Sequence, residues 1–123
     1  MTIDSNIVIA FIKGEGRVVQ QLSDWKQVGK SLLLSTIAEA EVLGFPRFGP
    51  EERRQTALFL EENFASMPCD RMTAYQAAVL RGTITIRLQD ALIAATALVT
   101  NTPLVTRNVN DFKKVPGLTI VKI

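Results

Sequence analysis

The sequence predicts an α/β fold with a mostly parallel sheet and helices on both faces. Short apolar segments with the composition of buried strands alternate with longer segments that have helical periodicity. This alternation is typical of parallel sheets covered by helices. The chain has 123 residues, of which 47% are hydrophobic and 21% charged, and this size and composition predict a single globular domain.

The first part of the chain predicts two strands and three helices. In order, these are a strand at 1–4, helices at 7–12 and 16–28, a strand at 32–34 and a helix ending near residue 43. Ser5 or Asn6 is the expected cap of the first helix, and Gly14 ends it. Ser35 or Thr36 is the expected cap of the third helix.

The second part predicts three helices and three strands. A helix begins at Pro50 and reaches about residue 63, because proline favours the first helical turn. The other elements are a short strand at 65–68, helices at 73–81 and 88–99, and strands at 103–106 and 118–121. The helix at 88–99 is apolar on nearly every side, which predicts a central position.

Composition excludes several kinds of function. The chain has no histidine and a single cysteine, Cys69, which excludes Ser-His-Asp and Cys-His catalysis, imidazole zinc sites and an intramolecular disulfide. The net charge of +2 is too small to identify a nucleic-acid-binding protein. No signal peptide is visible, and the apolar stretch at 91–99 is shorter than the roughly 20 residues that span a membrane. We therefore expect a cytoplasmic protein without membrane contact.

Four acidic residues occur in apolar segments or next to strands: Asp4, Glu41, Asp90 and Asp111. A carboxylate in an apolar setting costs several kcal/mol unless it is compensated. Asp4 ends the first strand and Asp111 follows the strand at 103–106, so both are expected at the carboxyl edge of the sheet, where sites form. Clustered carboxylates repel one another, and a Mg²⁺ or Mn²⁺ ion removes that cost. The sequence therefore predicts divalent-cation binding by these acids, with one or two ions.

Helix geometry separates Glu41 from its neighbour Glu39. Glu41 shares a helix face with Ile37 and has Ala40 beside it, whereas Glu39 lies about 200° away at about 100° per residue. If Ile37 and Ala40 pack inward, Glu41 points inward as well. Glu39 is then expected to face solvent or to form a salt bridge.

Each of the four acids also has an ordinary structural explanation. Asp90 could cap its helix or interact with the helix dipole, and Asp111 could form an Asx-turn. Asp4 could be a turn residue, and Glu41 could pair with a lysine or arginine. Their occurrence together at one expected sheet edge favours the shared metal site.

Four motifs contain these acids: Ile3-Asp4-Ser5-Asn6, residues 35–41, residues 88–97, and residues 104–112 followed by Pro116-Gly117-Leu118. Together they resemble the motifs of PIN-domain ribonucleases, specifically the small VapC-type toxins of prokaryotic toxin–antitoxin pairs. The similarity extends over essentially the whole chain, and residues 88–97 are its most specific part.

The resemblance implies a three-layer α/β/α sandwich, with one PIN domain over residues 1–123. It also implies an endoribonuclease that uses Mg²⁺ or Mn²⁺ to activate a water for hydrolysis of RNA phosphodiesters. The residues that it assigns to the metal and to catalysis are Asp4, Glu41, Asp90 and, in a fourth position, Asp111 or Asn108. Ser5 and Thr106 are implied to orient the acids or the water.

The resemblance further implies partners. A cognate antitoxin is expected to occupy the acidic groove, and a homodimer is expected, with the helices after the first strands at its interface. Phe45, Phe48 and Phe59 would suit either surface if exposed and the core if buried. Arg107 and Lys113 are the basic residues best placed for RNA phosphates.

Two rival functions are less consistent with the sequence. Haloacid-type phosphatases need Asp-x-Asp after the first strand, and Asp4-Ser5-Asn6 lacks the second aspartate. Receiver domains need a central aspartate at the end of a strand, and no residue fills that place. A non-catalytic PIN-like module that only binds proteins is the remaining alternative, and the presence of every expected acid disfavours it.

Overall fold

The computed structural model describes all 123 residues and contains a five-stranded sheet. The strands are β1 (Thr2–Ile3), β2 (Leu33–Ser35), β3 (Ala65–Met67), β4 (Leu104–Val105) and β5 (Ile120–Val121). They are ordered β3-β2-β1-β4-β5, and every neighbouring pair is parallel. The predicted α/β fold with a central parallel sheet is confirmed.

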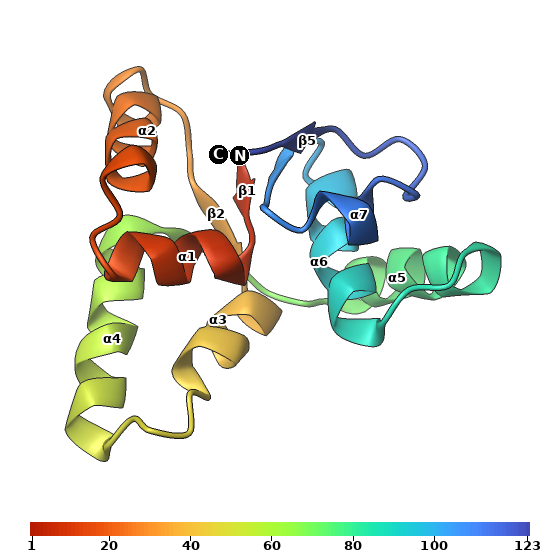
Figure 1. Cartoon of the computed structure of the whole chain (residues 1–123). Coiled ribbons are helices and arrows are strands. Elements are labelled where there is room, and N and C mark those ends of the chain that lie inside the picture. The colour runs from red at the N-terminus through yellow and green to blue at the C-terminus, as the bar shows by residue number, and fades with distance from the viewer.

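Seven helices connect these strands: α1 (Ser5–Ile12), α2 (Gly16–Gln27), α3 (Thr36–Leu43), α4 (Pro50–Asn63), α5 (Arg71–Thr83), α6 (Leu88–Val99) and α7 (Val109–Phe112). Connections between parallel strands are right-handed. Helices that lead to β2 and β3 on one side of β1 therefore cover one face of the sheet, and helices that lead to β4 and β5 on the other side cover the opposite face. Accordingly, Figure 1 shows α1 to α4 on one side of the strands and α5 to α7 on the other. The strands β2 and β3 are added on one side of β1, and the strands β4 and β5 on its other side. This change of side between β1 and β4 creates the switch point where α/β proteins form sites.

Side-chain caps set the beginnings of three helices. The Asp4 carboxylate accepts a hydrogen bond from the Ser5 backbone N–H at 2.8 Å and is the N-cap of α1. The expectation that Ser5 or Asn6 caps this helix is therefore wrong, because α1 begins directly after β1. Ser35 caps α3 by accepting from the Ile37 N–H at 3.1 Å. Asp70 caps α5, which begins at Arg71, earlier than predicted.

Helix α6 lies at the centre of the molecule, as its apolar sequence predicts. Its buried residues are Asp90, Ala91, Ile93, Ala94, Ala95, Thr96 and Ala97. Small side chains dominate this set, so the helix can approach the sheet and α5 closely. The short helix α7 was not predicted, because its four residues give too little periodicity to distinguish a helix from a loop.

The three phenylalanines differ in exposure. Phe59 is half-buried and packs on Phe11, with ring centroids 5.3 Å apart. Phe45 is 48% exposed and contacts the half-buried Phe48, with ring centroids 5.3 Å apart. None of the helices is long and apolar enough to cross a membrane.

Candidate functional site

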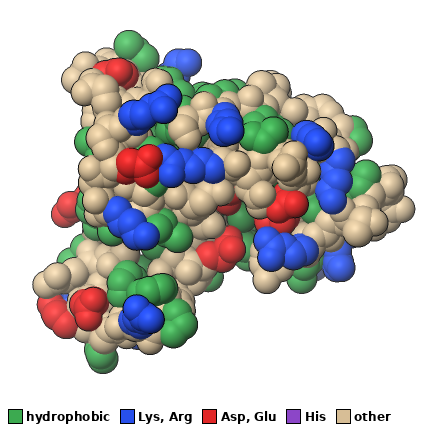
Figure 2. Space-filling view, viewed as in Figure 1, with side chains coloured by type: hydrophobic (Ala, Val, Ile, Leu, Met, Phe, Trp, Pro, Cys, Tyr) green, Lys and Arg blue, Asp and Glu red, His purple; other side chains and the backbone are tan.

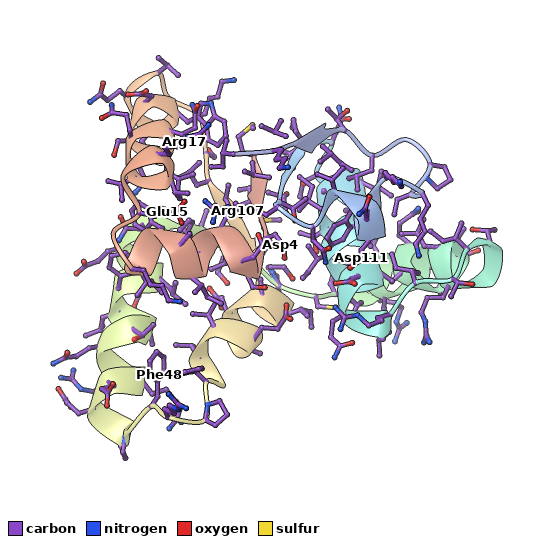
Figure 3. The ribbon with its side chains drawn as sticks, viewed as in Figure 1. Asp4, Glu15, Arg17, Phe48, Arg107 and Asp111 are labelled. Carbon is purple, nitrogen blue, oxygen red and sulfur yellow. The ribbon has the colours of Figure 1, made fainter.

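Asp4 lies where the central strand β1 ends and α1 begins, as Figure 3 shows. Asp4 is only 5% exposed to solvent. The neighbouring strand β4 ends just before Thr106, whose hydroxyl donates to Asp4 Oδ2 at 2.6 Å. Parallel pairing of β1 with β4 brings these two residues together although they are 102 positions apart in the chain.

The Thr106 hydroxyl is held in one orientation by its neighbours. It accepts hydrogen bonds from the Asn108 backbone N–H at 2.9 Å and from Asn6 Nδ2 at 3.4 Å. A hydroxyl has one hydrogen and two lone pairs, so both acceptor positions are used and the hydrogen points to Asp4. The expected orienting role of Thr106 therefore has a geometric basis. Sequence reasoning missed Asn6 as part of this network, although Asn6 belongs to the motif that contains Asp4.

The environment of Asp4 opposes its ionisation. Burial is the largest effect and raises the pKa of the Asp4 carboxyl, and the negative charge of Asp90 raises it further. Hydrogen bonds from Thr106 and from Ser5 lower the pKa, but the net shift is upward. Asp4 is thus a desolvated carboxyl that a nearby cation would stabilise in its charged form.

Glu41 on α3 belongs to the same electrostatic cluster. The pKa of its carboxyl is raised first by desolvation and then by repulsion from Asp4 and Asp90. Arg87 and the Ser5 hydroxyl oppose this shift. Because α3 also contacts α6, the structure brings Glu41 to the edge where Asp4 and Asp90 lie.

The packing of α3 differs from the expectation. Its buried residues are Ala38 and Val42, whereas Ala40 is exposed and Ile37 is half-buried. Glu41 is consequently exposed at the mouth of the cluster and does not point into the core. Glu39 is half-buried at the edge of a pocket beside α4 and forms no salt bridge, so it lies away from the acids, as predicted, but is only partly open to solvent. Ala38 and Val42, two apolar residues four positions apart, were the signal for the true core-facing side of the helix.

Asp90 lies in the first turn of α6 and is 7% exposed. The N-cap of α6 is Arg87, whose side chain makes no capping bond to the backbone. Instead, Arg87 Nε donates to Asp90 Oδ2 at 3.2 Å. This hydrogen bond raises the pKa of Arg87, and the charges of Asp111 and Glu41 add to the effect. The i, i+3 spacing of Arg87 and Asp90 could have identified Arg87 as a member of the site.

A hydrogen bond joins the two candidates for a fourth metal-binding position, Asp111 and Asn108. Asn108 is the N-cap of α7, and its Nδ2 donates to Asp111 Oδ2. Asp111 also faces a pocket of about 150 Å³. This pocket is lined by Thr85, Ile86, Arg87, Asp90, Asp111 and Lys114. The structure therefore places Asp111 beside Asp90.

The two basic residues predicted to meet RNA have different surroundings. Arg107 is engaged within the protein: its guanidinium pairs with Glu15 and its Nε donates to the Ile123 carbonyl at 3.1 Å. Figure 3 shows Glu15 and Arg107 near each other beside the end of α1. Lys113 is exposed and forms no ion pair.

The donor set suits a hard divalent cation, because it consists of carboxylate, amide and hydroxyl oxygens. No three acidic side chains converge into a preformed ligand group. The acidic side chains instead lie around the edge of the sheet, and repulsion from Asp4 and Asp90 contributes to the raised pKa of Glu41. Figure 2 shows acidic side chains near the middle of this face, with Lys and Arg side chains around them. We call the acids Asp4, Glu41, Asp90 and Asp111 the carboxylate cluster, and we call the carboxyl edge of the sheet at β1 and β4 the strand-switch edge. The fold and this site define a parallel α/β protein with a carboxylate cluster at its strand-switch edge.

Comparison with known proteins identifies the family. Residues 1–118 match the PIN domain family, and the chain belongs to this family. The chain is 28% identical, over an alignment of 132 positions, to a protein named Ribonuclease VapC1 from Rickettsia felis, with 100% of this chain and 96% of the relative covered. The resemblance to PIN-domain ribonucleases that the four motifs indicate is confirmed.

Solved structures of related proteins share the fold. A toxin–antitoxin complex from Klebsiella pneumoniae contains a chain that is 29% identical, with a TM-score of 0.80 over 98% of this chain and 94% of that one. VapBC2 from Rickettsia felis, bound to a DNA fragment from its promoter, matches with a TM-score of 0.84 and 23% identity over 99% of this chain and 97% of that one. These matches confirm the PIN-like α/β architecture.

Proposed function

We propose that the chain is a metal-dependent endoribonuclease that hydrolyses RNA phosphodiesters as the toxin component of a type II toxin–antitoxin system. The observation that carries this proposal is the electrostatic coupling of Asp4, Glu41 and Asp90 at the strand-switch edge. These acids come from the end of β1, from α3 and from α6. Membership of the PIN domain family and similarity to a protein named as a ribonuclease support the same activity.

The cofactor proposed is Mg²⁺ or Mn²⁺. Asp4, Glu41 and Asp90 would hold the ion, with Asp111 or Asn108 in a fourth position. Such an ion, when bound, makes water a better nucleophile and offsets negative charge on a phosphodiester.

The remaining contacts of the cluster prepare its carboxylates for this role. Thr106 and the Ser5 backbone N–H each donate to one oxygen of Asp4, which fixes the plane of that carboxylate. Arg87 holds one oxygen of Asp90. Since the chain has no histidine, its own proton acceptors at this edge are carboxylates.

The proposal includes two protein partners. The matched Klebsiella protein belongs to a toxin–antitoxin complex, and we infer that this chain is likewise held by a cognate antitoxin and forms a homodimer in the cytoplasm. Exposed apolar side chains are available for such contacts. Phe45 is 48% exposed in the loop before α4, and Met72 and Tyr75 on α5 are 66% and 73% exposed.

Cleavage of a mixed RNA pool tests the proposed activity. Purified protein free of antitoxin is incubated with the pool in Mg²⁺, in Mn²⁺ and in EDTA, and the fragments are separated on denaturing gels. We expect cleavage with either metal, none in EDTA, and a loss of at least about 100-fold in rate for Asp90→Asn, because one ligand and one site charge disappear.

Asp24→Asn is the matched control. Asp24 is an exposed residue on α2 that accepts a hydrogen bond from Gln20 at 2.7 Å, so the same chemical change occurs far from the cluster. Cleavage that persists in EDTA or in Asp90→Asn would contradict the proposal. Absence of cleavage, together with absence of Mn²⁺ binding by the folded protein, would favour the non-catalytic protein-binding module.

A further inference from the structure

Arg87 places a guanidinium at the mouth of the carboxylate cluster. Its only hydrogen bond joins Nε to Asp90 Oδ2 at 3.2 Å. The side chain is 72% exposed, whereas that of Asp90 is 9% exposed. The two terminal nitrogens, Nη1 and Nη2, therefore carry four N–H groups that have no partner in the protein.

The other hydrogen-bonded arginines use their terminal nitrogens within the protein. Arg53 donates from Nη2 to the Phe48 carbonyl at 3.2 Å. Arg54 donates from Nη2 to Glu51 at 2.6 Å, and Arg107 uses both terminal nitrogens on Glu15. All four arginines donate from Nε, but Arg87 alone among them makes no hydrogen bond from Nη1 or Nη2 and leaves this fork of N–H groups toward solvent.

The surroundings of this fork contain charges of both signs. Arg87, Lys114 and Thr85 line the pocket of about 150 Å³ together with Asp90 and Asp111. A phosphate that approaches carboxylates is repelled unless cations lie beside them. The pocket therefore has acids that suit a metal ion and, next to them, donors that suit an anion.

We propose that Arg87 binds a phosphate group of the RNA backbone beside the carboxylate cluster, donating from Nη1 and Nη2 while Nε stays on Asp90. This inference rests on the proposed ribonuclease function and adds a substrate-binding residue to it. The planar guanidinium can hold two oxygens of one phosphate in a forked arrangement. The bond to Asp90 fixes the fork relative to the acid, so the residue would align the phosphate with the metal-binding side of the pocket.

Lysine should be a poor replacement. Its ammonium is a point charge on a flexible stem and cannot bond Asp90 and the phosphate through a fixed plane. A residue that only balances the charge of the acids would be replaced well by lysine. Arg87→Lys and Arg87→Gln together therefore separate phosphate binding from charge compensation.

The experiment measures binding of a fluorescein-labelled, mixed-sequence single-stranded RNA by anisotropy. It is performed with Ca²⁺ and, separately, with EDTA over a range of KCl concentrations. We expect Arg87→Gln to weaken binding about 10-fold and to reduce the salt slope by about 0.7, the value for one phosphate contact with a single strand. Arg87→Lys should weaken binding at least about 5-fold, and Mn²⁺ affinity should fall in neither variant.

Arg47→Gln is the matched control, because Arg47 is exposed in the loop between α3 and α4. Its RNA affinity should stay within twofold of that of the unmodified protein. Full RNA affinity in Arg87→Gln, or full rescue by Arg87→Lys, would overturn the inference even if the protein cleaves RNA. Loss of RNA binding in both variants would uphold it even if no cleavage is found, so the two proposals fail separately. Thermal unfolding of each variant verifies that it is folded.

Discussion

Glu41 shows at the scale of one residue how a site can work against stability. Its carboxyl is partly desolvated and lies near Asp4 and Asp90, and both effects raise its pKa. A raised pKa in the folded state means that the folded protein binds this proton more tightly than the unfolded chain does. The stabilising contribution is therefore complete at pH values below the unfolded pKa and is lost as the pH rises through the folded pKa.

Glu41→Gln should accordingly stabilise the metal-free protein at pH 7 to 8, because it removes a repelled charge. We expect the thermal midpoint to rise by about 2 °C, a modest value because exposed charges are screened. The difference should disappear below about pH 4, where the carboxyl is protonated in both states. Thermal scans in EDTA over a pH series measure the effect.

Glu39→Gln provides the comparison on the same helix, since Glu39 lines a pocket beside α4 outside the cluster. A midpoint rise in Glu39→Gln as large as that in Glu41→Gln would show that repulsion within the cluster is not the cause. The same Glu41→Gln variant should lose at least about 10-fold in Mn²⁺ affinity, so stability and metal binding should change in opposite directions.

At the scale of the element, α3 depends on the cap that begins it. Ser35 is fully buried, and its hydroxyl accepts from the Ile37 N–H at 3.1 Å. Ser35→Ala should lower the free energy of unfolding by about 1 kcal/mol, the usual cost of losing a side-chain cap. Urea titration monitored by circular dichroism measures the change.

Ser23→Ala in the interior of α2 is the control, and it should alter the free energy of unfolding by no more than about 0.5 kcal/mol. Equal losses in the two variants would contradict the role of Ser35 as a cap. Because α3 holds Glu41, Ser35→Ala should also weaken Mn²⁺ binding, whereas Ser23→Ala should not.

The elements explain how much of the site could be predicted from the sequence. The predicted parallel sheet alone implied that Asp4 and the loop with Asp111 would meet at one edge, because carboxyl ends of parallel strands lie together. Helix periodicity could not predict the exposure of Glu41, because α3 is short and its apolar residues are spread around it. Ala40 looked like a core residue by type but is exposed.

Other parts of the site depend on contacts that no local pattern encodes. The bond between Thr106 and Asp4 requires the pairing of β1 with β4. The position of Arg87 depends on the four-residue connection between α5 and α6, where one cationic side chain has many possible directions. Charged residues in such connections usually face solvent, so residue type gave Arg87 no special role, and its i, i+3 spacing from Asp90 was the one available signal.

At the scale of the whole molecule, the candidate metal ligands come from elements distributed along the chain. An ion that binds them binds the folded state and not the unfolded chain, so it should raise the thermal midpoint. At an Mn²⁺ concentration of about 100 times the dissociation constant, the stabilisation should be about 2.7 kcal/mol. The gain should increase with pH, because the raised pKa values of Asp4 and Glu41 mean that protons compete with the ion.

Thermal scans with and without Mn²⁺ test this expectation for the protein and for Asp90→Asn. The shift should be lost in Asp90→Asn and retained in the control Asp24→Asn. Equal Mn²⁺ shifts in all three proteins would indicate that the ion acts elsewhere on the surface.

The central position of β1 has a consequence for synthesis on the ribosome. Residues of β1 emerge first, but one of the two strands that flank β1 contains Leu104 and Val105. Asp4 also obtains its hydrogen bond from Thr106, 102 residues later in the chain. A chain translated only as far as β3 therefore cannot assemble the acidic cluster, and any nuclease activity would begin only after residues 104–106 have been made.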